Sequence, residues 1–313
     1  MTETQLPDQV SEDSAAAPHQ GWRVFRTNKM AVAGLVVLSL VVVAAVFGPI
    51  ISPYDVLTQD VVNRLQGPSL AHPMGTDELG RDILTRVLAG GRISLLVGAL
   101  AMIVALVVGV SVGSLAGFYG KWVDNALMRL VDLSLSLPDL FLLILAASLL
   151  GPSVLTMVII IGMVRWMNVA RLVRASFLSL REQEFVQAAR AIGARSRHLV
   201  FRHLIPNSMG PVIVAGTLGV ASAIVAESTL SFLGLGLQPP ASSWGSMLRN
   251  AQSFVFSAPW YPVFPGFMIF ITVISINFIG DGLRDVLDPA GIGRVSGRLR
   301  RRQAAVLRAE DDS

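Results

Sequence analysis

The sequence contains no cysteine, and this absence excludes disulfide bonds, cysteine-ligated zinc sites and thiol catalysis. Charged residues are also scarce, at 15% of 313 residues, against roughly 25% in an average soluble domain. Hydrophobic residues make up 53% of the chain. A chain of this length has too few charges to cover a surface that faces water, so we expect much of its surface to face lipid.

The sequence also lacks two catalytic patterns. It has no Gly-x-x-x-x-Gly-Lys-Ser/Thr loop, the phosphate cradle of many ATPases, so ATP that drives this chain would have to bind to another one. Residues 109–113 spell Gly-Val-Ser-Val-Gly, as in serine hydrolases, but they lie inside an apolar run, whereas that elbow requires a strand, a turn and a helix. None of the four histidines falls within such a run, which leaves the serine without a base. We therefore expect no enzyme, and neither catalytic nor metal-ligating residues.

Six apolar runs are long enough for the roughly 20 residues that a membrane-spanning helix requires. The first begins after Lys29 and exceeds the length of a signal-peptide core, so we expect it to be retained. The third is interrupted by Asp132, Pro138 and Asp139, and only a tight turn at 151–153 separates it from the fourth. The runs cover residues 31–51, 94–117, 127–150, 154–173, 209–233 and 263–283. They predict an all-α polytopic membrane protein with six transmembrane helices.

The second run carries a stripe of glycines. Gly109, Gly113 and Gly117 are spaced four apart, so they share one face of a helix and allow another backbone to approach closely. This pattern predicts a helix–helix contact rather than a site for substrate.

Arginine and lysine set the orientation, because cytoplasmic loops are enriched in them. They cluster before the first run, around residues 121–129, between residues 171 and 202, and after residue 284. These four regions share one side of the membrane only if the number of spans is even. Six spans with both termini in the cytoplasm satisfy this condition. The opposite side then keeps residues 52–93, 151–153 and 234–262.

The expected organisation follows from these spans. A cytoplasmic tail, largely disordered at its polar start, precedes the first transmembrane helix, and an extracytoplasmic segment separates this helix from a core of five. A cytoplasmic loop interrupts the core, and a basic cytoplasmic tail follows it. In order, these parts are residues 1–29, 30–51, 52–93, 94–283 with the loop at 181–206, and 284–313.

The loop at 181–206 is polar, basic and too long for a plain turn. Phe185, Ala188, Ala189 and Ile192 fall at helical spacing and form one apolar face, and Gly193 suits the end of that helix. A second short helix fits residues 195–204, before Pro206. Two such helices either lie on lipid headgroups or present a ridge of small residues to a groove on another protein.

The spacing of this loop resembles the "EAA" loop of ABC-importer permeases, with two alanines followed at fixed distances by Gly193 and Pro206. The glutamate that the family usually has before the alanines is Gln187 here, although Glu184 lies one turn earlier. The resemblance implies contact with an ATPase, and it implies that the loop acts as a rigid lever. The residues expected to make this contact are Glu184, Gln187, Ala188, Ala189, Arg190, Gly193 and Pro206.

Three further motifs resemble the DppC/OppC type of permease subunit from dipeptide and oligopeptide ABC importers. They are Gly-Thr-Asp-x-x-Gly-Arg-Asp at 75–82, Leu-Ser-Phe-Leu-Gly-Leu-Gly at 230–236 with Trp-Gly at 244–245, and Asn-Phe-Ile-Gly-Asp-Gly-Leu-Arg-Asp at 277–285. Four ordered motifs extend the resemblance over residues 22–289. The fold that it implies is that of type I ABC-importer permeases, in a multi-pass protein of a prokaryotic inner or plasma membrane.

The resemblance also implies partners. These are a homologous second permease of DppB/OppB type, two ATPase subunits of DppD/DppF or OppD/OppF type, separate or fused, and an extracytoplasmic substrate-binding protein. The lipid bilayer is a further partner. ATP and Mg²⁺ would bind to the ATPase subunits, this chain would hold no cofactor, and nucleic acid is not a partner. Dipeptides or oligopeptides are the expected cargo. Nickel, glutathione or a sugar-like solute, or a stand-alone secondary transporter, are the alternatives.

Ionisable residues within spans are costly and usually face a cavity or a partner. We expect Asp139, Arg165, Asn168 and Glu227 as candidates for the translocation path. A structural alternative is that Arg165 pairs with Asp139 or extends to the interface. The outer segment at 52–93 either docks the binding protein or the second permease, or seals the ends of the helices.

Overall fold

The computed structural model describes residues 18–287, and this part of the chain is mostly helical. The expected start of the N-terminal tail and most of the basic tail at 284–313 lie outside the described residues. The helices are α1 (Pro18–Thr27), α2 (Lys29–Ile51), α3 (Ile83–Tyr119), α4 (Lys121–Leu135), α5 (Asp139–Leu150), α6 (Val154–Leu180), α7 (Glu184–Ala191), α8 (Ser196–His198), α9 (Ile205–Phe232), α10 (Trp244–Ala251) and α11 (Trp260–Leu287). Short 3₁₀ turns at Val61–Asn63 (η1) and Gln252–Phe254 (η3) and a π-type turn at Leu199–Leu204 (η2) complete the list.

Five of these helices are long and apolar enough to cross a membrane: α2, α3, α6, the continuous helix that contains α8 and α9, and α11. The α4 and α5 pair makes up to a sixth span, but it is bent by 87°. The span expected at 127–150 is therefore divided into two helices, at the position where Pro138 and Asp139 interrupt the apolar run. Ser136, Leu137 and Pro138 separate the two helices. The helix breaks here because a proline disfavours the α conformation of the residue before it.

α3 and α6 run in the same direction and pack through the glycine stripe. A Cβ at Gly109 would lie 2.5 Å from the Val169 Cβ, and one at Gly113 would lie 2.5 Å from the Ala170 carbonyl oxygen. Gly117 meets Phe177 in the same way. The expected helix–helix contact is confirmed, since only residues without a side chain allow this approach.

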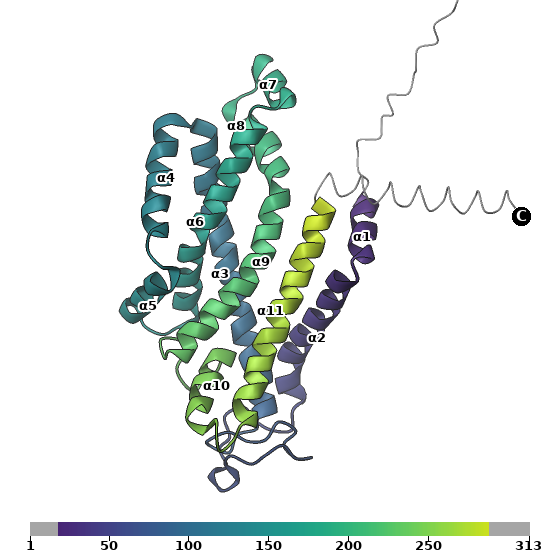
Figure 1. Ribbon diagram of the computed structural model, residues 1–313, viewed down its shortest axis with the longest axis vertical. Helices are drawn as coiled ribbons and strands as arrows, with labels where there is room; N and C mark the ends of the chain where they lie inside the picture. Colours follow the sequence, from purple (N-terminus) through teal and green to yellow (C-terminus); the bar gives the residue numbers. More distant parts are fainter. Residues whose placement is uncertain (1–17, 288–313) are drawn as a thin grey trace, which may run out of the picture.

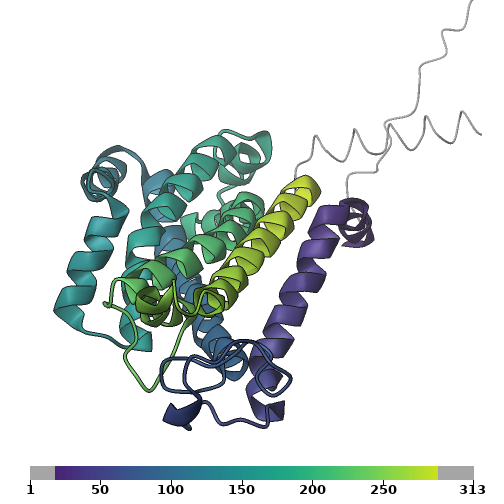
Figure 2. The same cartoon turned by 60° about the horizontal axis from the view of Figure 1, so that its bottom comes forward.

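α2 lies beside α11 at one edge of the bundle (Figure 2). Glycines again make the contact. A Cβ at Gly34 would lie 2.7 Å from the Ser275 carbonyl oxygen, and one at Gly282 would overlap the Ala31 side chain. The Asn28 side chain donates to the Asp285 carboxylate at 3.0 Å and ties the start of α2 to the end of α11. The first transmembrane helix is thus packed onto the last one.

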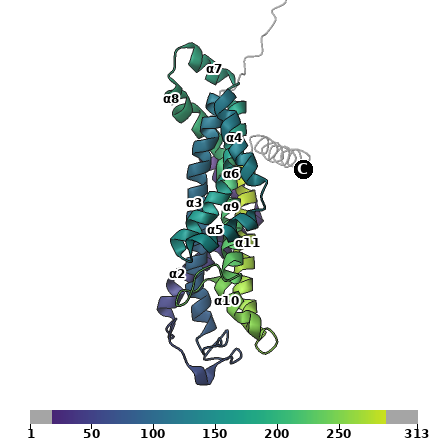
Figure 3. The same ribbon diagram turned by 90° about the vertical axis from the view of Figure 1, so that its left-hand side faces the viewer.

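The molecule is elongated, with two distinct ends (Figures 1 and 3). α7 and α8 project at one end, where α1 and the last turns of α11 also lie. The segment 52–82 and α10 lie at the opposite end. The basic regions that fall within the described residues therefore share one end, as the charge distribution requires for six crossings.

Candidate functional site

The loop between α6 and α9, residues 181–206, is the coupling loop below. Within it, α7 ends at Ala191, and Gly193 follows with a φ of +84°, a left-handed conformation that glycine adopts without strain. Val186 of α7 and Leu199 and Leu204 of η2 are fully or almost fully buried and extend the main hydrophobic core into the loop. The centroids of the Phe185 and His203 rings lie 6.3 Å apart, with the rings tilted by 48°. The loop is therefore a packed unit joined to the bundle.

The outer side of α7 presents apolar and small side chains to the surroundings. Phe185 is 43% exposed and Ile192 is 86% exposed. Ala188 lies between them and is exposed, and Ala189 is half-buried. The polar members of the expected set, Glu184, Gln187 and Arg190, are exposed as well, and so are Gly193 and Pro206. An apolar ridge is thus available for contact.

Gln187 lies beside a pocket of about 380 Å³ that Arg181, Glu182, Arg190 and Ala191 also line. Its side-chain amide donates to the Glu182 carbonyl oxygen at 3.1 Å. A glutamate carries no amide donor, so it could not make this hydrogen bond. This hydrogen bond therefore joins α7 to the short turn that follows α6.

Pro206 does not end a helix, contrary to the expectation of a separate helix at 195–204. The chain runs as one helix from Ser196 to Phe232. Pro206 is the second residue of α9 and so lies inside this continuous helix, and the wide π-type turn of η2 directly precedes it. The loop therefore passes without a break into a transmembrane helix.

Three carboxylate–arginine pairs join α4 and α5 to α6. Arg174 contacts both carboxylate oxygens of Asp124, Arg171 contacts Asp132, and the Arg165 Nη1 lies 3.8 Å from the Asp139 Oδ2. The Asp124 pair was not anticipated from the sequence, where Arg174 served only to mark the cytoplasmic side. These pairs hold the bent α4–α5 unit against the bundle.

A pocket of about 370 Å³ lies between α5, α6, α9 and α11. Asp139 and Arg165 line it together with Ser222, Thr229 and Asn277. The structure thus brings Asp139 and Arg165 together. Asn168 is exposed on α6 and does not line this pocket.

Glu227 lies elsewhere and is 0% exposed. Its carboxylate accepts hydrogen bonds from the Ser231 hydroxyl at 2.7 Å and from the Ser94 hydroxyl of α3 at 3.1 Å. The Ser94 hydroxyl also accepts from the Trp244 backbone N–H of α10 at 3.2 Å. Glu227 therefore connects three helices in this structure.

The segment 52–82 lies at the outer end of the bundle, and several residues of its Gly-Thr-Asp-x-x-Gly-Arg-Asp motif at 75–82 have a structural role. Gly75 and Gly80 have φ values of +80° and +74°, and a Cβ at Gly80 would overlap the Asp60 carbonyl oxygen. Asp82 caps α3 by accepting from the Thr85 N–H at 2.8 Å. This cap explains why α3 begins at Ile83 and not near residue 94, where the apolar run begins.

A buried ion cluster anchors this closure. Asp77 is 0% exposed and accepts from Arg81 Nε at 2.7 Å, while Arg86 Nε lies 3.3 Å from the same carboxylate. Glu78 accepts from Arg81 at 3.1 Å and from the Tyr261 hydroxyl of α11 at 2.6 Å. The geometry supports the sealing alternative for the segment, because the cluster joins it to α3 and α11.

α10 was not expected from the sequence, which indicated only a loop at 234–262. Ser243 and Ser246 form a reciprocal capping box at its start. Trp244 is fully buried and donates to the Val87 carbonyl oxygen at 2.9 Å, and Gly245 packs on the backbone of Ser228. The signal was present in the spacing of these two serines.

Two known protein families match parts of this chain. Residues 109–291 match the family described as "Binding-protein-dependent transport system inner membrane component". Residues 19–68 match the "N-terminal TM domain of oligopeptide transport permease C". The two matches together extend from α1 to the last helix.

Several relatives are similar over nearly their whole length. The dipeptide transport system permease protein DppC of Alkalihalophilus pseudofirmus is 42% identical over 92% of this chain and 95% of its own. The oligopeptide permease protein OppC of Bacillus subtilis is 39% identical, over 90% and 92%. The glutathione transport system permease protein GsiD of Escherichia coli is 40% identical, over 90% and 93%.

A solved structure shares the fold. The inward-facing MetNI methionine ABC transporter contains a chain that superimposes with a TM-score of 0.53 at 18% identity, over 64% of this chain and 96% of that one. At this identity the likeness concerns the fold alone. It supports the expected fold, which is that of ABC-importer permeases.

Proposed function

The chain belongs to the family of binding-protein-dependent transport system inner membrane components, and on that basis we propose that it is one of two permease subunits of an ATP-driven importer of dipeptides or oligopeptides. It is a multi-pass protein of the bacterial plasma membrane. In the proposed complex a homologous permease forms the other half of the path. Two ATPase subunits bind ATP and Mg²⁺ at the cytoplasmic end, and a binding protein delivers the cargo outside.

The exposed ridge on α7 is the observation that carries this proposal. Neighbouring apolar side chains that are exposed outside the membrane are typical of a contact with another protein. Here they lie on a loop that is anchored by the buried side chains of Val186 and Leu204. We assign the ridge to a groove on an ATPase subunit.

The connection to the bundle gives the loop its proposed action as a lever. Its N-terminal side continues from α6, and its C-terminal side passes into α9 without a break. A displacement of the ridge by the ATPases would therefore tilt both helices. α3 would move with α6, because the glycine contacts leave no room for sliding.

The pocket beside Asp139 and Arg165 is our candidate for part of the translocation path. A peptide carries an ammonium group at one end and a carboxylate at the other. The Asp139 carboxylate and the Arg165 guanidinium, both partly exposed, offer one charge of each sign at the wall of a single pocket. Charges at membrane depth face such cavities.

The cargo is tested by expressing this chain together with the proposed partner subunits encoded in neighbouring reading frames. Uptake is then measured with the complete complex in vesicles. We expect ATP-driven uptake of a labelled dipeptide that unlabelled di- and tripeptides suppress. Uptake of glutathione, nickel or a sugar with no competition from peptides would overturn the peptide assignment and retain the importer.

The coupling role is tested with Gly193→Leu. Nothing lies within 4 Å of a Cβ at this position, so the cost is confined to the left-handed backbone, about 1–2 kcal/mol. We expect normal insertion, with ATP hydrolysis uncoupled from uptake. Normal coupled uptake by this variant would contradict the lever. Gly210→Ala is the matched control, because its Cβ meets only Leu287 at 3.8 Å.

A further inference from the structure

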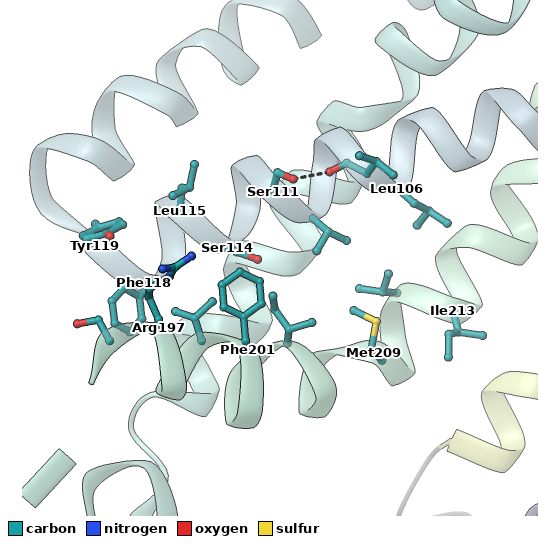
Figure 4. Close-up of a pocket in the computed structure, with 16 residues that line it drawn as sticks. Leu106, Ser111, Ser114, Leu115, Phe118, Tyr119, Arg197, Phe201, Met209 and Ile213 are labelled. Atoms are coloured by element: carbon teal, nitrogen blue, oxygen red, sulfur yellow. Dashed lines mark hydrogen bonds between the residues drawn. The ribbon is translucent and has the colours of Figure 1, made fainter. Parts of the chain in front are cut away.

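An apolar groove of about 760 Å³ lies between α3 and the helix formed by α8, η2 and the start of α9. It is separate from the pocket beside Asp139, and the ridge on α7 does not line it. Figure 4 shows Leu106 and Ile213 at one end and Tyr119 and Arg197 at the other. The groove thus runs along the bundle toward the cytoplasmic end.

Its length matches one leaflet of a bilayer. The residues of α3 that line it run from Leu106 to Tyr119, a rise of about 20 Å at 1.5 Å per residue. Half of a hydrocarbon core is about 15 Å thick. The apolar part therefore fits the acyl region of the cytoplasmic leaflet, and the cytoplasmic end of the groove lies at the level of the headgroups.

The charge at the groove has one sign. Arg197 lines its cytoplasmic end, and no carboxylate among residues 18–287 forms an ion pair with it. Arg195 and Arg202 of the same loop are also exposed. Basic side chains at this level attract anionic headgroups of the cytoplasmic leaflet.

A second polar group in the wall has no partner of its own. Ser114 is 7% exposed, and its hydroxyl forms no hydrogen bond within the described part of the chain. It lies in the wall between the apolar end and Arg197 (Figure 4). A buried hydroxyl without a partner is costly. The Ser114 oxygen is covered by its neighbours, so an acceptor on a lipid in the groove reaches it only if the wall moves.

We propose that this groove binds one acyl chain of an anionic phospholipid of the cytoplasmic leaflet, with the lipid phosphate on Arg197. The lipid then lies between α3 and the helix that carries the coupling loop. Its binding stabilises the position of that helix relative to α3. A transmembrane helix of the second permease is the rival occupant, and the cross-linking experiment below distinguishes the two.

The experiment uses the purified complex in nanodiscs that contain photoreactive phosphatidylglycerol or phosphatidylcholine with the same diazirine-bearing acyl chain. Cross-linked peptides are identified by mass spectrometry. We expect phosphatidylglycerol to label α3 and η2 about fivefold more than phosphatidylcholine, the preference that one arginine near the membrane surface supplies. Arg197→Gln should remove this preference. Arg195→Gln is the matched control, since Arg195 is exposed in the same loop but does not line the groove.

A second pair of variants tests the groove itself. Ser111 is exposed and lines the groove, so Ser111→Phe fills it without disturbing the core. We expect it to abolish labelling by both lipids, whereas Ile103→Phe, at an exposed position of α3 outside the groove, should not. Equal labelling by the two lipids that Arg197→Gln leaves unchanged would overturn the proposal. Cross-linking of Ser111→Cys to the second permease in place of lipid would overturn it in favour of a helix.

Discussion

Single residues in this protein decide how closely helices approach. Gly113 is the clearest case, because a Cβ there would lie 2.5 Å from a carbonyl oxygen of α6. The spacing of the three glycines was enough to predict the contact. The partner helix was not predictable, because the pattern on α3 carries no information about which neighbour it meets.

Gly113→Leu should therefore separate α3 from α6 and lower stability by at least about 1–3 kcal/mol, as overpacking does in a tight interface. Thermal unfolding in detergent, followed by size-exclusion fluorescence, measures the loss. Gly266→Ala serves as the control and should unfold at or above the wild-type temperature, because a Cβ at this position of α11 meets only Leu248, at 3.8 Å, and alanine favours a helix. Equal unfolding temperatures for Gly113→Leu and wild type would contradict the contact.

Glu227 makes the second prediction at this scale. The structure buries its carboxylate between hydroxyl donors from α3 and α9. Glu227→Ala leaves those hydroxyls unpaired and should reduce the yield of assembled complex. Glu227→Gln keeps one acceptor oxygen and should assemble nearly normally. If both variants assemble as the wild type does and lose only uptake, Glu227 faces the path and does not support the helices.

At the scale of elements, sequence periodicity and length predicted the long spans and missed the irregular ones. Five runs correspond to spanning helices. The bend between α4 and α5 was signalled by Pro138 and the two aspartates, but hydropathy alone joined them into one helix. The start of α3 was also missed, because Arg86 and Arg92 interrupt the apolar run although Asp82 caps a helix that includes them.

The coupling loop was predicted in composition and only partly in shape. Three of the residues expected to form an apolar face, Phe185, Ala188 and Ala189, lie on α7, and the fourth, Ile192, directly follows it; Phe185 and Ile192 are both exposed. Pro206 was expected to bound the loop, yet the helix continues through it. The π-type turn of η2 directly precedes this proline inside the continuous helix. The sequence does not specify a π-type turn, so the continuation of the helix through Pro206 was not predictable.

Ile192 tests α7 as an interface. It is 86% exposed, so Ile192→Asp costs the isolated chain little but places a charge in a contact from which water is excluded. We expect the ATPase subunits to co-purify at least about tenfold less well. Ile192→Leu preserves the apolar contact and should behave as the wild type. Undiminished co-purification with Ile192→Asp would show that this side of α7 lies on lipid headgroups or faces water instead.

For the whole molecule, the absence of cysteine that limits its chemistry also makes its topology measurable. Any cysteine introduced is the only thiol in the chain. Ile192 at one end and Val62 at the other are 86% and 91% exposed, so a membrane-impermeant maleimide should reach either residue from one side only. We expect Val62→Cys to be labelled in intact cells, and Ile192→Cys only in inside-out vesicles.

The binding of the ATPases supplies a further contrast within the same assay. If the ridge on α7 is covered in the complex, labelling of Ile192→Cys in inside-out vesicles should be slow when the ATPases are present and fast after they are stripped with alkali. Val62→Cys in intact cells should not respond to the ATPases. Between the two positions the chain crosses three times, through α3, the α4–α5 pair and α6, and an odd number of crossings places them on opposite sides. Labelling of both positions from the same side would contradict this count, and with it the assignment of the basic end to the cytoplasm. The assay therefore tests the orientation and the coupling contact independently. The side from which each cysteine is labelled reports the orientation, and the rate at which Ile192→Cys is labelled reports the contact.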